Sequence, residues 1–198
     1  MVISTDKAVE PINIYGITKA AAEKIAVESN LGHQHIKTKV SVCRYGNVMG
    51  SAGSVIPIWQ KQCKDGTLIV TDKRMTRFLI TMESAIKFIL NSIETMNGGE
   101  VFVPKIPSAK ITTIAEAIGP GCHLAEVGKR PGEKLHEILL TESEAAHTKE
   151  FDNHFIVEPE FDFWQKDDIG GKPLPENFSY SSDNNKEWLS VEDIRKLL

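Results

Sequence analysis

Tyr15 and Lys19 are the two residues of the sequence whose types and spacing best suit proton-transfer chemistry. A separation of four residues places both side chains on one face of a helix, one turn apart. A lysine ammonium beside a phenol stabilises the phenolate and lowers the pKa of the phenol, so a tyrosine so placed can act as a general base near neutral pH. Spacing alone favours a simpler interpretation, a solvated helical face, so the chemistry needs support from neighbouring residues.

That support comes from the polar segment Thr5-Asp6-Lys7, which lies ten residues before Tyr15. Together these residues resemble the active site of the extended short-chain dehydrogenase/reductases. In that family a Ser or Thr at the end of one strand joins a Tyr and a Lys at the head of the next helix. The resemblance implies that Thr5, Tyr15 and Lys19 occupy these positions.

Further motifs along essentially the whole chain are similar to the C-terminal part of the polysaccharide-biosynthesis dehydratases. The branch with the strongest similarity is the inverting UDP-N-acetylglucosamine 4,6-dehydratases, which open pseudaminic acid synthesis. The motifs that carry this resemblance are Asp6-Lys7, Arg44-Tyr-Gly-Asn-Val48, Gly50-Ser51, Gly53-Ser54, Arg74-Met-Thr-Arg77-Phe78, Gly98-Gly-Glu100, Phe102-Val-Pro-Lys105, Arg130-Pro-Gly-Glu-Lys-Leu-His-Glu137, Tyr180-Ser-Ser182, Asn184-Asn185 and Trp188-Leu189.

The resemblance implies a reaction and a role for each catalytic residue. The sugar is oxidised at carbon 4 with bound NADP, loses water across carbons 5 and 6, and receives the hydride at carbon 6. Tyr15 would take the 4-hydroxyl proton, Lys19 would hold the nicotinamide ribose, and Thr5 would hydrogen-bond the same hydroxyl. Asp6 would protonate the departing 6-hydroxyl, and Lys7 would remove the carbon-5 proton. Lys7 and Tyr15 would therefore both contact the substrate and take part in the reaction.

Two positions place the chain within this family. Retaining relatives usually have Glu where this chain has Lys7, and a desolvated lysine can lose its proton near neutrality, so Lys7 favours the inverting branch. The large membrane-anchored relatives typically have Met where this chain has Tyr15, so Tyr15 favours the short, soluble type.

The resemblance also implies binding residues, and each has a simpler structural interpretation. Asn47 would hydrogen-bond the substrate, and the backbone of Val48, Met49, Gly50, Ser51 and Ala52 would approach the cofactor; alternatively this loop is only a tight turn. Arg130 and Glu133 would hold the diphosphate and ribose of the UDP, or they form a surface salt bridge. A last substrate-binding segment comprises Ser181, Ser182, Asp183 and Asn184. Its alternative is a capped turn, and the family more often has His at position 183.

Composition excludes several other classes. The chain has 198 residues, 41% of them hydrophobic, and a formal net charge of −4, with scattered Lys and Arg. These values favour a soluble domain whose core needs no disulfide or metal, and they disfavour a nucleic-acid partner. Neither a membrane-spanning apolar run nor a signal pattern is present, so we expect a cytoplasmic protein. The three cysteines lack metal-binding spacing, and we expect each to be a small buried hydrophobe.

The elements that must position these residues alternate between helices and strands. Periodicity and β-branched runs predict helices over 13–30, 55–64, 81–96 and 112–118, and strands over 38–44, 68–71 and 101–104. This order is typical of an α/β fold, which we interpret as the C-terminal half of a Rossmann-like parallel sheet. Residues 1–105 are expected to form this half and residues 106–198 a smaller, irregular α+β substrate-binding region.

The Gly-rich phosphate-binding turn of a first Rossmann half has no counterpart in the sequence. We therefore expect an N-terminally truncated form of an enzyme that is inactive alone, whose full-length relatives are homo-oligomers. Two alternatives stay open at this stage. One is a retaining or epimerising relative that acts on a similar UDP-sugar, and the other is a subunit that only binds nucleotide-sugar or pairs with a homologue.

Overall fold

The computed structural model describes residues 1–31, 38–51, 54–160 and 169–198, which form two compact units. Unit 1 comprises Met1–Tyr45, Ala85–Lys105 and Ile138–Tyr180. Unit 2 comprises Gly46–Ser84, Ile106–Glu137 and Ser181–Leu198. The chain thus passes between the units after residues 45, 84, 105, 137 and 180, and the boundary expected after residue 105 is one of these passages.

Unit 1 is built on a six-stranded sheet. Its strands, in order across the sheet, are β1 (Val2–Thr5), β2 (Val42–Tyr45), β6 (Val101–Pro104), β11 (His154–Val157), β10 (Thr148–Glu150) and β12 (Lys172–Pro173). The pairs β1–β2 and β2–β6 are parallel, and the remaining three pairs are antiparallel. The predicted α/β class with a parallel sheet is confirmed, and the antiparallel strands extend that sheet.

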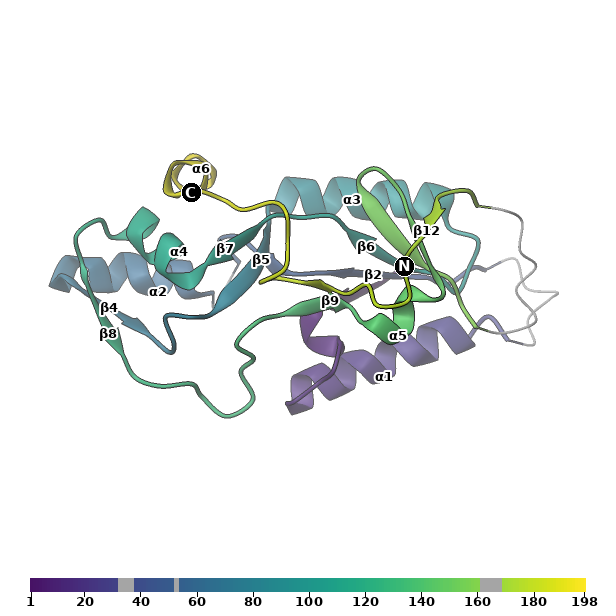
Figure 1. Ribbon diagram of the computed structural model, residues 1–198, viewed down its shortest axis with the longest axis horizontal. Coiled ribbons are helices and arrows are strands. Elements are labelled where there is room, and N and C mark those ends of the chain that lie inside the picture. Colours follow the sequence, from purple (N-terminus) through teal and green to yellow (C-terminus); the bar gives the residue numbers. More distant parts are fainter. Residues whose placement is uncertain (32–37, 52–53, 161–168) are drawn as a thin grey trace. The chain divides into compact units, whose positions relative to one another are not determined.

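Two helices provide the crossovers that parallel strands require. Helix α1 (Ile14–Glu28) lies between β1 and β2 in the chain, and α3 (Met82–Thr95) lies between β2 and β6. They lie on opposite sides of β2 and β6, as Figure 1 shows.

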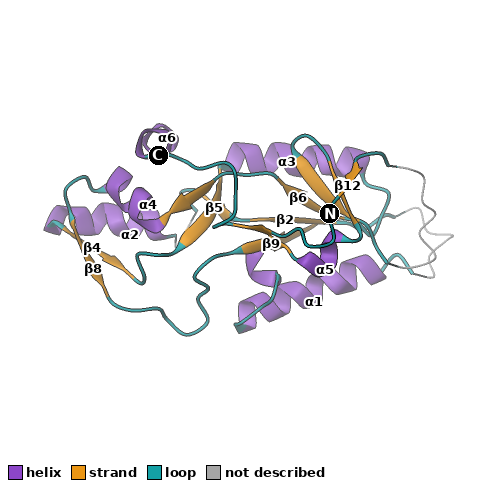
Figure 2. Ribbon diagram, viewed as in Figure 1, coloured by secondary structure: helices purple, strands orange, loops and turns teal. Residues whose placement is uncertain are grey.

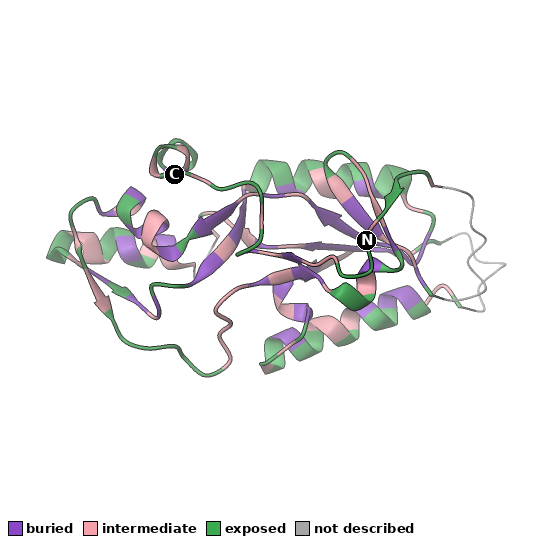
Figure 3. Ribbon diagram, in the orientation of Figure 1, coloured by how far each residue is buried: buried purple, intermediate pink, exposed green. Residues whose placement is uncertain are grey.

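Successive side chains of strand β2 contact these two helices alternately. Cys43 packs on one face in a cluster that includes Phe88 and Ile89 of α3. Its neighbour Arg44 points to the other face and bonds to Glu23 of α1. Successive residues of a strand face opposite sides, so this register fixes which residues each helix can meet. Figure 3 shows the resulting pattern, with buried strands between helices whose outer faces are exposed.

The remaining elements of unit 1 are short, as Figure 2 shows. A 3-10 turn, η1 (Asp6–Ala8), follows β1 directly. Strand β9 (Ile138–Leu140) pairs with β13 (Tyr180–Ser181), and α5 (Glu142–Ala145) follows β9. Thr141 caps α5 in a capping box with Glu144, which fixes the direction of the Glu144 side chain.

Unit 2 contains two small sheets and several short helices. One sheet has the order β3 (Asn47–Val48), β5 (Thr76–Ile80) and β7 (Ser108–Lys110), and the other pairs β4 (Thr67–Val70) with β8 (His123–Glu126). The helices are α2 (Val55–Gln62), the 3-10 turn η2 (Cys63–Asp65), α4 (Ile111–Ile118) and α6 (Val191–Leu197).

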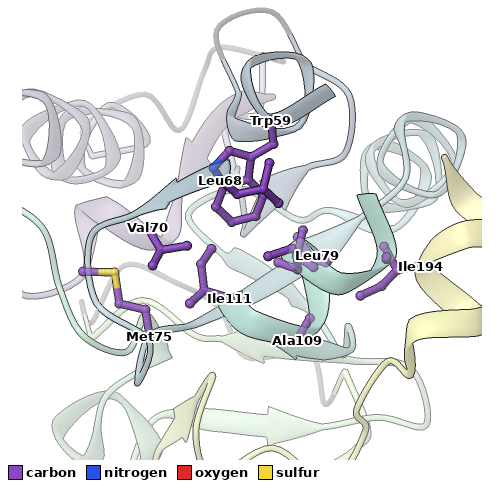
Figure 4. Packing of buried hydrophobic residues seen from close by; sticks show 11 residues of the cluster. Trp59, Leu68, Val70, Met75, Leu79, Ala109, Ile111 and Ile194 are labelled. Atoms are coloured by element: carbon purple, nitrogen blue, oxygen red, sulfur yellow. The ribbon is translucent and has the colours of Figure 1, made fainter. Parts of the chain in front are cut away.

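The core of unit 2 collects one apolar face from each of these elements. Trp59 of α2 is 2% exposed, and its indole N–H donates to the carbonyl of Ile69 over 2.8 Å. Figure 4 shows Trp59 beside Leu68, with Leu79 and Ile111 close by and Ile194 of α6 at the far side. The last helix of the chain is therefore part of this core.

The faces that α1 and α3 bury differ from what their apolar periodicity suggests. On α1, Ile14, Ile17 and Ile25 are 75%, 50% and 70% exposed, whereas Glu23 is buried. On α3, Ile86, Leu90 and Ile93 of the expected apolar face are also exposed. The inner face of α1 is occupied instead by a close backbone contact and an ion pair.

That ion pair belongs to a buried network centred on Arg44. Its guanidinium donates to both carboxylate oxygens of Glu23 (3.0 and 2.6 Å), to both of Glu144 (3.1 and 2.9 Å) and to the carbonyl of Leu139 (3.0 Å). Burial lowers the pKa of Arg44, but the charges of Glu144 and Glu23 outweigh it and raise the pKa overall. The network ties α1, β2 and α5 together within unit 1.

Replacing Arg44 should show how strongly unit 1 depends on this network. In Arg44→Met two carboxylates lose their shared cation inside the protein, so we expect the free energy of unfolding to fall by about 3–5 kcal/mol. Arg74→Met is the matched control, because Arg74 also forms a two-point pair, with Asp72, but its side chain is 76% exposed. Urea unfolding of both variants measures the difference, and equal losses would contradict the prediction.

Candidate functional site

The predicted catalytic residues Thr5, Asp6 and Lys7 form a hydrogen-bonded cluster where β1 runs into η1. The Thr5 hydroxyl donates to Oδ1 of Asp6 over 2.9 Å, and the Lys7 ammonium donates to the same oxygen over 2.8 Å. The backbone N–H of Lys7 also donates to the Thr5 hydroxyl oxygen at 3.4 Å. A single carboxylate oxygen therefore receives both a hydroxyl and an ammonium.

Asp6 is the buried centre of this cluster. It is 0% exposed, whereas the Lys7 side chain is 31% exposed. The second carboxylate oxygen of Asp6, Oδ2, is buried and has no hydrogen-bond partner among the described residues. A buried oxygen without a donor is uncommon, because its desolvation is then uncompensated. Such an oxygen can carry a proton or accept one further donor.

Helix α1 presents Tyr15, Lys19 and Glu23 on one face, at successive intervals of four residues. Lys19 donates to the carbonyl of Ile3 on β1 over 2.9 Å, and Glu23 binds Arg44 of β2. The Tyr15 side chain, at the N-terminal end of the face, is 52% exposed. The face is thus fixed to two strands while the phenol stays accessible.

The close approach of α1 to η1 depends on Gly16. Asn13 caps α1 by accepting the N–H of Gly16 over 2.8 Å. A Cβ at Gly16 would lie 2.2 Å from the carbonyl oxygen of Lys7, so no larger residue fits without movement of the backbone. Gly16 therefore brings the backbone beside Tyr15 next to that of Lys7.

Tyr45 is a candidate that sequence reasoning did not assign. It is the register partner of Thr5 in the β1–β2 pair. Its pKa is raised, first because burial disfavours the phenolate and then by electrostatic interactions with Cys43 and Tyr15. Tyr45 thus remains a neutral phenol near Tyr15. Its place in the Arg44-Tyr-Gly-Asn motif was the available sequence signal.

The predicted loop residues lie in unit 2. Asn47 pairs with Leu79 in the β3–β5 register, and its side-chain oxygen is buried without a hydrogen-bond partner among the described residues. Gly50 has φ +69°, and a Cβ there would meet nothing within 4 Å. The backbone at Gly50 therefore borders open space. Val48, Met49 and Ser51 lie beside it, and Ala52 lies outside the described residues.

Arg130 and Glu133 form a surface turn of unit 2. The backbone N–H of Arg130 donates to the Glu133 carboxylate at 3.3 Å, and the N–H of Glu133 donates to the Arg130 carbonyl at 3.2 Å. The expected alternative of a guanidinium–carboxylate salt bridge is not formed. Within the described part of the chain, the Arg130 guanidinium has no hydrogen-bond or ion-pair partner.

A chain of hydrogen bonds connects three segments of unit 2. The Thr76 hydroxyl lies 2.8 Å from Nδ1 of His136 and 2.6 Å from the Ser182 hydroxyl. Ser182 also accepts the backbone N–H of Glu137 over 2.9 Å. The segment around His136 and the tail segment that begins at Ser181 are thereby joined through Thr76 on β5.

The predicted substrate residues of the tail divide into two groups. Ser182 is 0% exposed and its hydroxyl is used inside the protein, so it holds the segment in place and is unsuited to touching a ligand. Asp183 and Asn184 are exposed. Asn184 accepts the N–H of Ser181 over 2.9 Å, and Asp183 accepts the Ser181 hydroxyl over 2.6 Å. This is the capped turn expected as the alternative, with two side chains on its outer surface.

Comparison with known proteins identifies the family. The family model described as "Polysaccharide biosynthesis protein" matches residues 1–159, which include all five predicted catalytic residues. The chain belongs to the polysaccharide biosynthesis protein family. The resemblance drawn from the sequence motifs is thus confirmed at the level of the family.

Individual relatives of this polysaccharide biosynthesis protein are similar over nearly its whole length. It is 43% identical to UDP-N-acetylglucosamine 4,6-dehydratase (inverting) of Campylobacter jejuni over 99% of the chain and 62% of that relative. It is 35% identical to UDP-glucose 4-epimerase of Rickettsia felis over 100% of the chain and 60% of that relative. The chain therefore spans about three fifths of the length of the curated relatives it matches.

Solved structures support the same grouping. The X-ray structure of Pen from Bacillus thuringiensis matches 98% of this polysaccharide biosynthesis protein and 60% of that chain, with a TM-score of 0.85 and 31% identity. A second match is the structure of a dTDP-glucose 4,6-dehydratase from Bacillus anthracis in complex with NAD, with a TM-score of 0.56. This match covers 66% of the present chain and 49% of the dehydratase chain. At 18% identity, this second match shows a shared fold alone. In the described ranges, no helix is both long and apolar enough to cross a membrane.

Gly16→Ala should test the close contact between α1 and η1. Gly to Ala inside an exposed helix normally stabilises by about 1 kcal/mol. Here the added Cβ meets the Lys7 carbonyl at 2.2 Å, so we expect a destabilised protein instead. Thermal unfolding gives the sign of the change, and a higher melting temperature for the variant would contradict the close contact.

Ser182→Ala and Ser181→Ala form a matched pair that separates the two roles in the tail. Loss of the Ser182 hydroxyl leaves the Glu137 N–H without its acceptor, so we expect the free energy of unfolding to fall by about 1–3 kcal/mol. Ser181→Ala removes a hydroxyl whose bond is exposed, and the change should be much smaller. Chemical denaturation compares them, and a larger loss for Ser181→Ala would reverse the assignment.

Proposed function

We propose that this chain carries the catalytic residues of a nucleotide-sugar dehydratase that converts UDP-N-acetylglucosamine to a 4-keto-6-deoxy sugar with inversion at carbon 5. The observation that carries the proposal is the 2.8 Å bond between Lys7 and the fully buried Asp6. Elimination of water needs an acid and a base held side by side, and these two residues supply both. The 43% identity to the inverting dehydratase of Campylobacter jejuni supports the same reaction.

For the proposed catalysis, one proton must move from Lys7 to Asp6. As an ion pair, Lys7 is protonated and Asp6 is not, so neither can perform its proposed role. Transfer of one proton from Nζ to Oδ1 produces a neutral amine, which can remove the carbon-5 proton, and a carboxylic acid, which can protonate the 6-hydroxyl.

Tyr15, Lys19 and Thr5 serve the preceding oxidation at carbon 4. The exposed phenol of Tyr15 takes the 4-hydroxyl proton. The Lys19 ammonium uses one proton on the Ile3 carbonyl, which leaves two donors for a ribose hydroxyl or the phenolate. The Thr5 proton is directed at Asp6, so toward the sugar its oxygen acts as an acceptor.

A nicotinamide dinucleotide is the cofactor that this chemistry requires, and the NADP form is the more specific proposal. When bound, it accepts the hydride from carbon 4 and returns it to carbon 6. The residues present in unit 1 suit such a group, because Tyr15 is exposed and Lys19 keeps donors for a ribose. In unit 2 the Gly50 backbone borders open space, and we propose it for the cofactor together with the backbone of Val48, Met49 and Ser51.

The UDP-sugar is proposed to contact unit 2 through groups that the fold leaves available. Asn47 offers a buried oxygen without a partner in the described ranges, and Arg130 offers a guanidinium to the diphosphate. Glu133 is proposed for the ribose hydroxyls, and Asp183 and Asn184 for the sugar. A homo-oligomeric assembly and a cytoplasmic location remain predictions of the resemblance and the composition.

An epimerase is the second candidate, because the chain is 35% identical to UDP-glucose 4-epimerase of Rickettsia felis. Such a reaction also begins by oxidation at carbon 4 and would use Tyr15 and Lys19 in the same way. It removes no proton from carbon 5, so it would give the Asp6–Lys7 pair no role. The formation of that pair therefore favours the dehydratase.

Turnover tests the proposed function directly. The chain is assayed alone and fused to the part of the Campylobacter jejuni relative that it does not match, with UDP-N-acetylglucosamine and either NADP or NAD. We expect the fusion to form a sugar nucleotide lighter by one water, detected by mass spectrometry, with inverted carbon 5 in proton NMR. A 4-epimer without loss of water would establish the second candidate, and an unchanged substrate would overturn both.

Lys7→Ala in the same fusion should abolish dehydration, with turnover reduced by about 10²–10⁴-fold, because the carbon-5 proton loses its base. Affinity for UDP, measured by calorimetry, should change little because the role proposed for Lys7 is on the sugar and not on the nucleotide. Lys61→Ala, which removes an exposed lysine of α2, is the control and should retain full turnover. Full dehydration by Lys7→Ala would remove this residue from the mechanism.

A further inference from the structure

Two cysteines in unit 2 lie close enough to react with each other. The sulfur atoms of Cys63 and Cys122 are 3.5 Å apart, although 58 residues separate them in the sequence. Both are free thiols of intermediate burial, at the edge of the apolar core of this unit. The expectation that each cysteine is merely a small buried hydrophobe therefore does not describe this pair.

The fold brings the two sulfurs together through the β4–β8 pair. Cys63 begins η2, which ends at Asp65 with Gly66 as its C-cap, and β4 follows at Thr67. Cys122 immediately precedes His123, the register partner of Thr67 in the parallel pair. The N–H of His123 donates to the Gly66 carbonyl over 2.9 Å and continues the pairing toward the thiols. The two cysteines thus flank the same end of one two-stranded sheet.

Gly119 leaves the space that both sulfurs occupy. A Cβ at this position would lie 2.9 Å from the Cys122 sulfur and 3.2 Å from the Cys63 sulfur. Contacts this short require one neighbour to move. The absence of a side chain at the end of α4 is therefore part of what allows the thiols to meet.

The hydrogen bond between the thiols makes the two cysteines chemically inequivalent. The Cys122 S–H donates to the sulfur of Cys63 at 3.5 Å. The pKa of Cys122 is raised, first by this hydrogen bond and then by burial and the negative charge of Cys63. Cys122 therefore retains its proton longer and is the weaker first nucleophile. Because the thiolate is the nucleophile, Cys63 is the sulfur that attacks first.

We propose that Cys63 and Cys122 form a reversible disulfide site that takes low-molecular-weight disulfides, such as oxidised glutathione, as its oxidant. The Cys63 thiolate attacks one sulfur of the oxidant, forms a mixed disulfide and releases the first glutathione thiolate. Cys122 then loses its proton to solvent and attacks the Cys63 sulfur, which releases the second glutathione thiolate. Two protein thiols are oxidised by two electrons, and one glutathione disulfide is reduced to two thiols.

The disulfide would connect η2 to the turn before β8. A two-stranded sheet has little stability of its own, so a covalent link at its end should restrict its opening. The crosslink also closes a long loop and lowers the entropy of the unfolded chain, an effect that grows with loop length.

Cys43 provides an internal control. It is 0% exposed on β2 of unit 1, and burial raises its pKa to about 11 despite a hydrogen bond with Ser92. A fully buried thiol that retains its proton does not react with glutathione disulfide while the protein is folded. Oxidation should therefore distinguish the pair from the third cysteine.

The test treats the native chain with oxidised glutathione, alkylates it after denaturation and measures the intact mass. We expect a loss of about 2 Da, for the two hydrogen atoms removed, and one alkylated cysteine, Cys43. Peptide mapping should show Cys63 linked to Cys122, and reduction should reverse the change. The oxidised form should melt roughly 5–10 °C higher than the reduced form.

Variants make the proposal falsifiable. Cys122→Ser should stop at a mixed glutathione disulfide on Cys63, whereas Cys43→Ser should form the crosslink as rapidly as the parent chain. Gly119→Ala should slow crosslinking at least tenfold, because its Cβ displaces the sulfurs. Three free thiols after oxidation, stable mixed disulfides in the parent chain, or a crosslink that includes Cys43 would each overturn the proposal.

Discussion

The placement of the candidate catalytic residues depends on how the inner face of α1 is held against the parallel strands. Lys19 binds the Ile3 carbonyl of β1, and one turn later Glu23 binds Arg44 of β2. A helix attached at two points along one face has little freedom to rotate about its axis. Tyr15 lies one turn before Lys19 on that face, so its direction follows from these two attachments.

This arrangement explains which features of unit 1 could be predicted from sequence and which could not. The helix predicted over residues 13–30 follows from local periodicity, and it forms as α1. The strand end at Thr5 was implied by the family resemblance, and β1 ends there. The buried face of α1 does not follow, because periodicity assigns apolar residues to the core. Here the inner face uses Gly16 for close approach and Glu23 for charge. Both depend on partners that are distant in sequence, so local pattern carries little information about them.

The same limit applies to the candidate binding residues of unit 2. Ser181 and Ser182 are adjacent and chemically identical, and the sequence offers no reason to separate them. In the structure one hydroxyl belongs to the buried chain through Thr76 and His136, and the other lies in an exposed turn. The difference arises from the pairing of the tail with the segment before Ile138, which joins residues far apart in the chain. Candidate roles could therefore be predicted for the segment but not for its individual residues.

The ion pairs formed by Arg44 and by Lys7 differ in what they can do because their cations differ. Arg44 retains its proton under all ordinary conditions, so its network with Glu23 and Glu144 is a permanent charge arrangement that fixes structure. Lys7 donates to Asp6, and a lysine, unlike an arginine, can act as a base once it has lost a proton, which is the role proposed for it. Exchange of the two cations would remove the permanent charge at position 44 and the possible base at position 7, since an arginine at position 7 could not act as a base. Arginine thus suits the permanent charge of the network at position 44, and lysine suits the proton transfer proposed for position 7.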